Sequence, residues 1–559
     1  MRSMKRNGGL VVAAWLSVLA APVCAQTPGQ IRAAEPGATQ ERQMEEERRR
    51  REMERDERAP VTEPLKRPVT ELPAPQAESE AVRFFVREIQ FTESKILGAE
   101  ELGRLAAEYQ GRELSLADLR QLTVRINELY RSKGVVTAQA LLPPQDVTSG
   151  IIRVRLVEGR LGKVNLDGNA STNASYITDL LRVQPDELMD LPRLEEALVR
   201  FNRTNDVQLR AELRPGEAFA TTDLNLAVRE PPRQEFRFTL DTLGAESTGK
   251  NRAGLAYQNR SLFGFRDDLM LAYIQALGQE SAAATYAIPV NTWGGRLNLG
   301  YYKDKTWIKK GALSSLNITG ESESEVVSLR QPIYVDSKSQ LDVVVGGKTR
   351  RSTNWIDRVF LSRTDTNDAN LGLEAQWFSK QSNWFAGYTR YFGDAKVVTT
   401  EHYVIDRGTL RFNSELGYGL SFRGMAAWQA THKELLPSSE ALFIGGEGSV
   451  RGYPVGVYSG DTGQVVNLEV HHPLLTASDA TNGLGATGFF FADYGRVKPF
   501  RPPNSTLSKH DNLTGIGWGV HSTLGKHFYA RLVFGYGLDR IPNQPRNYEI
   551  SFKVVATAF

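Results

Sequence analysis

The feature that most restricts the fold is an alternation of apolar residues with small or polar ones through residues 234–559. In the clearest run, every second position from Phe528 to Tyr536 is apolar, and Arg531 and Gly535 stand between them. Successive side chains of a β-strand point to opposite faces, so this period of two predicts strands with one apolar face. No stretch after residue 25 holds the roughly 18 consecutive apolar residues of a spanning helix, so any membrane role requires strands.

An outward apolar set with an inward set of Gly, Arg, Glu and Asn is typical of a transmembrane barrel wall. A soluble β-sandwich or propeller also alternates. The length of the region and its many Trp and Tyr residues, which suit membrane interfaces, favour the barrel. At about 20 residues per strand with its turn, residues 233–559 hold roughly sixteen strands. We therefore predict an all-β transmembrane barrel of about sixteen antiparallel strands.

Three details of the barrel region can also be predicted. Proline lacks a ladder donor, so Pro289, Pro332 and Pro473 mark strand ends. The polar stretches at 361–370 and 496–511 are predicted to be loops. Phe559 has the opposite parity to the apolar set of the last strand, so either a bulge corrects the phase or Phe559 faces the lumen.

Residues 1–25 have the pattern of a secretory signal peptide. A basic start is followed by apolar residues from Leu10 to Ala21 and by the small-residue site Val23-Cys24-Ala25. A lipoprotein signal ending at Cys24 is the alternative, which Pro22-Val23 disfavours. Cleavage after Ala25 would remove the only cysteine, so the mature chain would have no disulfide and no thiol site.

Residues 26–80 contain a charged run and then a proline-rich linker. The run at 41–58 has no apolar face, but Glu precedes Arg by four residues in pairs such as Glu45/Arg49 and Glu54/Arg58. Such a segment is usually a solvated helix or a disordered run. The alternative is a polar helix inside a water-filled lumen. The prolines that follow, from Pro60 to Pro75, predict an extended and semi-rigid linker.

Residues 81–158 and 159–232 read as two small α+β domains with one order of elements. In the first, a strand at Phe84–Phe91 precedes a helix at Ala99–Tyr109 and a second helix opened by Ser115 and Asp118. Two further strands complete this domain. The order of strand, helix, helix, strand and strand then recurs between residues 161 and 228, which predicts a tandem repeat.

The sequence has no motif typical of catalysis or of metal binding. His471-His472 has no partner at metal-ligand spacing, and Gly445–Gly448 lacks the Lys-Ser/Thr of a phosphate loop. The 68 Lys and Arg residues nearly cancel the 65 Asp and Glu residues, so composition gives no case for nucleic acid. We therefore predict no enzymatic activity, no cofactor, no metal and no nucleic-acid partner.

Three motifs carry a resemblance to a known family. They are Val450-Arg451-Gly452-Tyr453, the stretch Phe491-Ala492-Asp493 with Gly495, and the segment from Tyr130 to Gly159, which ends Val-Glu-Gly. Together with the charged run, the proline linker, the two small domains and the barrel, they make the chain resemble the two-partner secretion transporters. These form the hemolysin and filamentous-hemagglutinin secretion/activation family.

The resemblance implies two polypeptide-transport-associated (POTRA) domains in the periplasm and a barrel in the bacterial outer membrane. It implies export of a large secreted β-helical exoprotein, an adhesin, cytolysin or toxin, bound through the POTRA domains. It also implies contact with outer-membrane lipid and lipopolysaccharide, and insertion by the barrel-assembly machinery. A barrel-assembly factor of the same superfamily typically lacks the charged helix and linker, and a passive porin does not explain the tandem domains.

The resemblance also implies a role for the barrel motifs. In the family, the Val-Arg-Gly-Tyr motif lies at the tip of the longest inward-folded loop, and the Phe-x-Asp motif lies on a neighbouring strand. Arg451 is a long cation beside Gly452, where the backbone can turn tightly. We therefore expect Arg451 to reach Asp493 inside the barrel. The alternative is an arginine that is only solvated at a loop tip.

Overall fold

The computed structural model describes residues 28–39, 41, 65–66, 83–133, 135, 138–218, 221–311, 313–475, 483–501, 505, 508–542 and 547–559. The predicted signal peptide, and all of the predicted helix at 41–58 except Glu41, lie outside these residues. The chain divides into two compact units, one of Pro60–Pro231 and one of Pro232–Phe559 together with the N-terminal segment. No helix among the described residues is both long and apolar enough to cross a membrane.

The first small domain packs two helices on a three-stranded sheet. Its longer helix begins with a reciprocal cap, in which the Asp118 N–H donates to the Ser115 hydroxyl over 3.2 Å and the Ser115 N–H donates to Asp118 over 2.8 Å. Leu119, Leu122 and Ile126 then follow at helical spacing and are buried in the core. The elements are β2 (Arg83–Val86), β3 (Glu88–Phe91), α4 (Ala99–Ala107), β4 (Arg112–Ser115), α5 (Leu116–Ser132), β5 (Gln139–Leu141) and β6 (Ile151–Val157).

The second small domain repeats this topology. In the first domain β3 runs parallel to β6, which pairs antiparallel with β5, and in the second domain the first strand likewise runs parallel to the last, which pairs antiparallel with the strand before it. A short strand of the linker, β1 (Leu65–Lys66), adds in parallel to the free edge of β8. The elements are β7 (Arg160–Asp167), α6 (Ala174–Leu181), α7 (Leu191–Thr204), β8 (Gln208–Pro215) and β9 (Thr221–Arg229).

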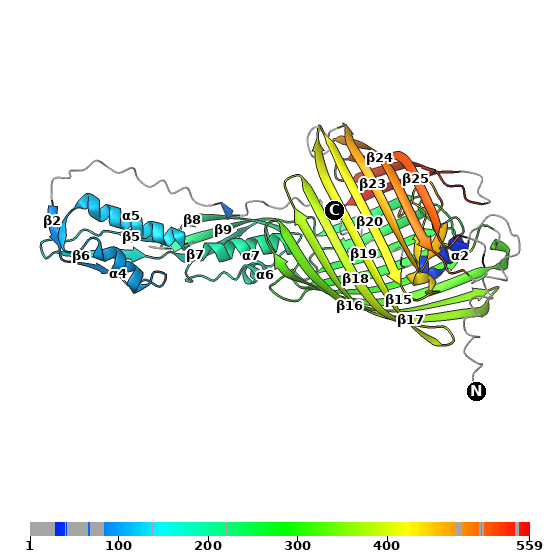
Figure 1. Cartoon of the computed structure of the whole chain (residues 1–559), viewed down its shortest axis with the longest axis horizontal. Coiled ribbons are helices and arrows are strands. Elements are labelled where there is room, and N and C mark those ends of the chain that lie inside the picture. The colour runs from blue at the N-terminus through cyan, green and yellow to red at the C-terminus, as the bar shows by residue number, and fades with distance from the viewer. Residues whose placement is uncertain are drawn as a thin grey trace. The chain divides into compact units, whose positions relative to one another are not determined.

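The other unit is a closed antiparallel barrel of sixteen strands, β10–β20 and β23–β27, as predicted (Figure 1). β10 closes the barrel by pairing with β27 from Phe236↔Ala558 to Asp241↔Lys553. The first eight strands are β10 (Gln234–Asp241), β11 (Arg252–Asn259), β12 (Asp268–Ala276), β13 (Gln279–Pro289), β14 (Arg296–Trp307), β15 (Ile318–Val335), β16 (Ser339–Ile356) and β17 (Val359–Phe378). The others are β18 (Ser382–Lys396), β19 (Thr400–Gly417), β20 (Leu420–Thr431), β23 (Thr462–Leu475), β24 (Leu484–Lys498), β25 (Asp511–Leu524), β26 (Phe528–Gly537) and β27 (Tyr548–Ala558).

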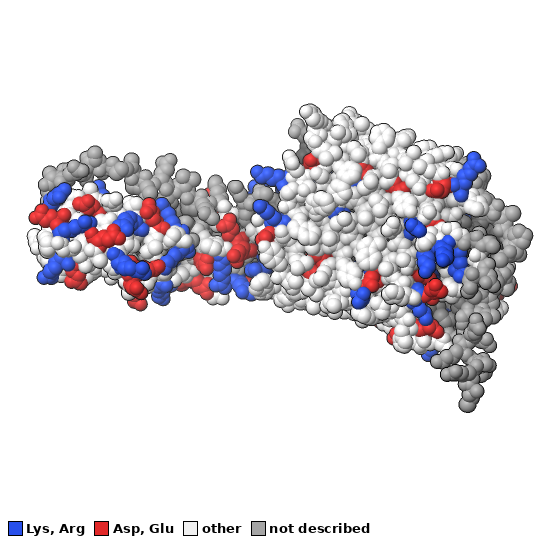
Figure 2. Space-filling view, viewed as in Figure 1, with Lys and Arg blue, Asp and Glu red and all other residues white. Residues whose placement is uncertain are grey.

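The alternation separates the two faces of the wall. On β24, Phe490 is 73% exposed and Phe491 is 5% exposed, because Phe490 points outward and Phe491 points into the lumen. Figure 2 shows the result on the barrel face that it draws, where a broad band has few charged residues and Lys, Arg, Asp and Glu gather toward one end. This is the division of surface that a membrane-spanning wall requires.

One sequence-based expectation about the barrel is wrong, and the open question about Phe559 can be answered. The predicted loop at 361–370 is wrong, because these residues lie within β17, where residues 362–370 pair with β16 and residues 365–370 pair with β18 as well. Polar residues persist there because they pair across strands, as in the 3.0 Å ion pair of Arg351 with Asp365. Phe559 lies beyond the end of β27, whose ladders have no register shift, and its ring lies 5.5 Å from that of His527.

A short helix begins earlier in the chain than the predicted one. It is α2 (Pro28–Ala33), and helical turns continue at residues 36–39. Ala33, Ala34 and Ala38 are buried. A side chain on Gly29 would lie 2.5 Å from the Val457 carbonyl oxygen, so only glycine permits this approach. This segment therefore packs against the long connection between β20 and β23.

Candidate functional site in the barrel lumen

The connection between β20 and β23, residues 432–461, folds into the barrel. It contains a short 3-10 helix, η2 (Ser438–Glu440), and a two-stranded hairpin of β21 (Leu442–Ile444) and β22 (Tyr458–Gly460). Its tip carries the Val-Arg-Gly-Tyr motif, and Val450, Arg451 and Tyr453 are buried there. The sequence-predicted motif therefore lies inside the protein and not at a solvated loop end.

Arg451 binds Asp493 of β24 through three donors. Its backbone N–H and its Nε–H donate to Oδ2 over 3.0 and 2.7 Å, and Nη2 donates to Oδ1 over 2.7 Å. Asn467 of β23 donates to the same carboxylate over 2.8 Å. The guanidinium carbon also lies 3.7 Å from the centre of the Phe491 ring. The structure thus brings together the residues that the resemblance had paired.

Glu469 is a second carboxylate at this site, which the sequence analysis did not single out. Arg451 Nη1 donates to it, and His471 Nε2 lies 2.7 Å from its other oxygen. Asn467, Glu469 and His471 alternate along the lumen face of β23, opposite Asp493, Phe491 and Phe489 of β24. The period of two was therefore the signal that could have identified Glu469, once Asp493 was placed in the lumen.

A second ion pair, of reversed polarity, holds the same loop tip. Here the loop supplies the carboxylate, Glu447, and the wall supplies Arg531 of β26, at 3.0 Å. Ser551 of β27 also donates to Glu447, over 2.8 Å. The loop tip is thus fixed by ion pairs of both polarities to β23, β24 and β26 and by a hydrogen bond to β27, and Asp493 and Arg451 are almost completely buried. Breaking such a pair on one side leaves an uncompensated buried charge, which costs about 3–5 kcal/mol.

Glycines on the lumen face make room for the loop. A side chain on Gly515 of β25 would collide with the Arg451 carbonyl, and one on Gly537 of β26 would lie 2.5 Å from the Tyr453 ring. Gly452 has φ +91°, which disfavours other residues, and a side chain there would lie 2.7 Å from the Gly537 nitrogen. Gly495 of β24 makes room in the same way for Val450. The wall is therefore shaped to receive the motif.

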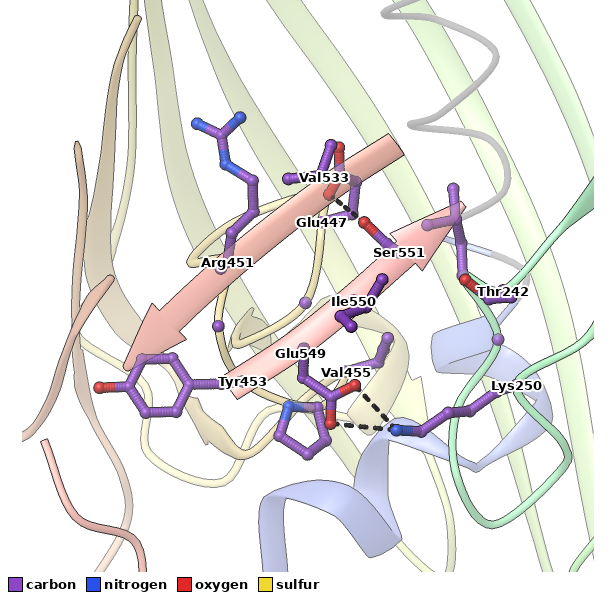
Figure 3. A pocket seen from close by; sticks show the side chains of 16 residues that line it. Thr242, Lys250, Glu447, Arg451, Tyr453, Val455, Val533, Glu549, Ile550 and Ser551 are labelled. Carbon is purple, nitrogen blue, oxygen red and sulfur yellow. Dashed lines mark hydrogen bonds and ion pairs between the residues drawn. The ribbon is translucent and has the colours of Figure 1, made fainter. Parts of the chain in front are cut away.

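Tyr453 fixes the end of the motif. Its hydroxyl donates to the Thr514 carbonyl over 2.8 Å and accepts from the Asp539 N–H over 2.8 Å. Figure 3 shows a small pocket at the tip, lined in part by Arg451 and Tyr453, where Ser551 donates to Glu447 and Lys250 donates to Glu549. Lys250 and Glu549 are 2.9 Å apart.

The Val-Glu-Gly end of the first-domain motif has a structural role. The Glu158 carboxylate accepts the N–H groups of Lys95 and Ile96 over 3.0 and 3.2 Å, and the hydroxyl of Tyr130 over 3.2 Å. Burial, together with the neighbouring carboxylate, raises the pKa of Tyr130 to about 12. Glu158 thus ties the turn before α4 to the end of α5, which explains why Tyr130 and Glu158 occur in one motif.

Comparisons with known proteins agree with this architecture. The family described as haemolysin secretion/activation protein ShlB/FhaC/HecB matches residues 220–522, and the ShlB-type POTRA domain matches residues 84–159. The heme/hemopexin transporter protein HuxB of Haemophilus influenzae (strain 86-028NP) is 23% identical over 82% of this chain and 86% of its own. The outer membrane transporter CdiB of Dickeya dadantii (strain 3937) is also 23% identical, over 68% of this chain and 71% of its own.

Solved structures share the fold. CdiB from Escherichia coli has a TM-score of 0.66 at 19% identity and covers 96% of this chain and 100% of its own. BamA from Haemophilus ducreyi lacking POTRA domains 1–3 has a TM-score of 0.50 at 13% identity, over 85% of this chain and 100% of its own. The fold alone is therefore shared with BamA, and the family match distinguishes the two.

The closed barrel, the POTRA fold and the inward loop define a class of proteins, the outer-membrane transporters of polypeptides. Within this class, the chain belongs to the haemolysin secretion/activation family ShlB/FhaC/HecB. It is an outer-membrane transporter of two-partner secretion with its N-terminal domains in the periplasm, and it exports a partner protein.

Proposed function

We propose that the exported partner is a large β-helical exoprotein, such as an adhesin, cytolysin or toxin, and that the POTRA domains bind it by strand addition. The pairing of β1 with β8 carries this proposal. Leu65↔Ala211 and Lys66↔Glu212 pair in parallel, and Leu65 is buried in the domain core. An extended segment with an apolar side chain can therefore join this sheet edge, and added strands are a common way to bind extended peptides.

The proposed division of the chain follows the sequence. Residues 1–25 are a signal peptide, 26–80 a polar helix and linker, 81–158 and 159–232 the two POTRA domains, and 233–559 the barrel. The chain acts by transport alone and catalyses no reaction. Outer-membrane lipid and lipopolysaccharide surround the barrel, the barrel-assembly machinery inserts it, and folding of the partner outside the cell drives export.

In the same proposal, the Arg451 site is a latch and the N-terminal segment is a plug. The triple contact of Arg451 with Asp493 holds the loop against β24 while the partner passes. The segment around α2 lies in the barrel unit at rest, against β22, and is displaced when the partner enters.

Deleting residues 81–232 tests the assignment of partner recognition to the POTRA domains. The partner is the large exoprotein encoded beside this gene, and its amount in the medium is compared between the full chain and the deletion. We expect export to stop while the barrel remains in the outer membrane and still conducts ions, since within the described residues the strands of the barrel pair with one another and with no strand of residues 81–232. Export that continues with the deleted form would contradict the proposal.

A further inference from the structure

A second group of charged side chains lies in the barrel, apart from the Arg451 site. It contains three cations, Lys348 and Arg350 of β16 and Arg407 of β19. Glu41 of the N-terminal segment contacts all three, with distances of 2.6 Å to Arg350, 3.3 Å to Lys348 and 3.4 Å to Arg407. A simple surface salt bridge joins one carboxylate to one cation. Glu41 instead contacts three cations that lie on two separate strands.

Glu440 of η2 contacts the same three cations. It lies 2.9 Å from Lys348, 3.1 Å from Arg407 and 3.3 Å from Arg350. Glu440 belongs to the long inward connection that carries Arg451 at its tip, so the N-terminal segment and this connection share one set of counter-charges. Asp368 of β17 lies 3.5 Å from Lys348 and completes the group.

Burial makes the balance of charge important. The side chains of Arg350 and Glu440 are each 1% exposed, and that of Lys348 is 7% exposed. With Glu41 in place, the three cations contact three carboxylates, and without it Glu440 and Asp368 remain of the carboxylates that the described part of the chain brings within ion-pair distance of them. A buried cation left without its counter-charge is costly, so the vacated site favours binding of another anion.

Glu41 behaves as the ligand of this site. Burial alone would raise the pKa of its carboxyl, but Lys348, Arg350 and Arg407 together hold that pKa below its ordinary value. Glu41 also differs from Glu440 in its attachment. Glu440 lies on a loop that is joined at both ends to barrel strands. Glu41 lies on the N-terminal segment, which is not part of a connection between two barrel strands.

We propose that Lys348, Arg350 and Arg407 form a carboxylate-binding site in the lumen, filled at rest by Glu41 and open to acidic side chains of the passing polypeptide. This inference rests on the proposed displacement of the N-terminal segment. When that segment leaves, Glu440 shares the three cations with Asp368 alone among the described carboxylates that contact them, so the base of the long connection is held more firmly. A passing chain meets a site with one net positive charge, where aspartate and glutamate dwell longest.

Channel recordings of the full-length protein in planar bilayers test the site. Glu41→Gln removes the resting ligand's charge at nearly constant shape, so this variant should be open for a larger fraction of the time than the unmodified protein. Hexaglutamate is then added to the open Glu41→Gln channel, with hexalysine as the probe of opposite charge. Adding Arg350→Gln to this background should shorten the hexaglutamate blocks about tenfold, the value of one charged hydrogen bond.

Arg237→Gln in the same background is the matched control, because Arg237 is an arginine on β10 whose ion pair is with Glu235. It should leave the blocks unchanged. Arg350→Lys keeps the charge and should restore part of the block duration if Arg350→Gln acts through the site and not through misfolding. An open fraction unchanged by Glu41→Gln would overturn the inference, as would equal blocks in the Arg350→Gln and Arg237→Gln channels. The proposed displacement of the segment is tested separately, with a chain whose segment is covalently fixed. If that chain still secretes its partner, the segment does not need to move.

Discussion

At the scale of single residues, the Arg451 site is asymmetric in a way that a simple ion pair would not be. Asp493 has Arg451 and Asn467 as donors, whereas Arg451 has both Asp493 and Glu469 as acceptors. Loss of Asp493 therefore leaves Arg451 one carboxylate. Loss of Arg451 removes the cation that both carboxylates share, although Arg531 and His471 remain near Glu469.

We predict that Arg451→Ala impairs secretion more than Asp493→Ala, and that the double variant is less impaired than the sum of the two losses. The reason is that removing the second partner also removes the stranded charge. The measurement is partner protein in the medium divided by heat-modifiable barrel in the membrane. The charge-swapped pair, Arg451→Asp with Asp493→Arg, should recover part of the export. Strictly additive losses, or full export by both single variants, would return Arg451 to the role of an ordinary loop residue.

The sequence identified Arg451 and Asp493 only through the motif resemblance, and it missed Glu469, Glu447 and Arg531. These three residues come together with the motif only when the loop enters the barrel, and, apart from the His471 neighbour of Glu469, their partners lie 18 to 104 positions away. The alternation places Glu469 on the lumen face, but many lumen residues of a barrel are polar. Local pattern therefore indicates the face of a residue but not its partner across the lumen.

At the scale of elements, the small helix at the N-terminus and the long connection fit each other through glycines. Gly29 lies against Val457, and a side chain on Gly37 would place its Cβ 3.2 Å from that of Ser439. The sequence did not indicate this helix, because α2 has no apolar stripe of large residues and the strong charge pairing lies further along, at 41–58. The strand number was predictable because each strand must alternate, whereas the 361–370 region shows that polar strand ends resemble loops.

A disulfide between these elements tests whether the segment must move. Gly37→Cys with Ser439→Cys places two Cβ atoms 3.2 Å apart, slightly closer than the about 3.5–4.5 Å that disulfides favour, and the Ser352 hydroxyl, 2.8 Å from the new Cβ, must rotate away. We predict that the oxidised double variant stops exporting its partner, because the segment is then fixed to the loop base. A reducing agent should restore export, and either single cysteine variant should export normally. Undiminished export by the fully oxidised form would show that the segment need not leave.

At the scale of the whole molecule, closure of the barrel is independent of what lies inside it. β10 and β27 complete the ring by backbone pairing, and the sixteen strands satisfy one another's hydrogen bonds without the N-terminal segment. The contents of the lumen add ion pairs to this wall at two places, the Arg451 site and the Glu41 site. Closure of the barrel and its permeability are therefore set by different parts of the same unit.

This separation predicts the behaviour of a chain that lacks residues 41–58. Its barrel should still migrate faster before heating than after it on gels, and residues beyond about 234 should still resist periplasmic protease, because the backbone pairing of a closed barrel is intact. Its conductance in planar bilayers should rise if the charged run lies in the pore as proposed, because the deletion removes that run together with Glu41, the residue that contacts the lumen cations. Deleting a linker stretch of equal length, residues 67–82 with two further linker residues, is the control for chain length and should leave the current unchanged. A deleted form that conducts no more than the full chain would place the charged run outside the lumen, and one that loses its heat-modifiable migration would show that the segment is part of the barrel's own stability.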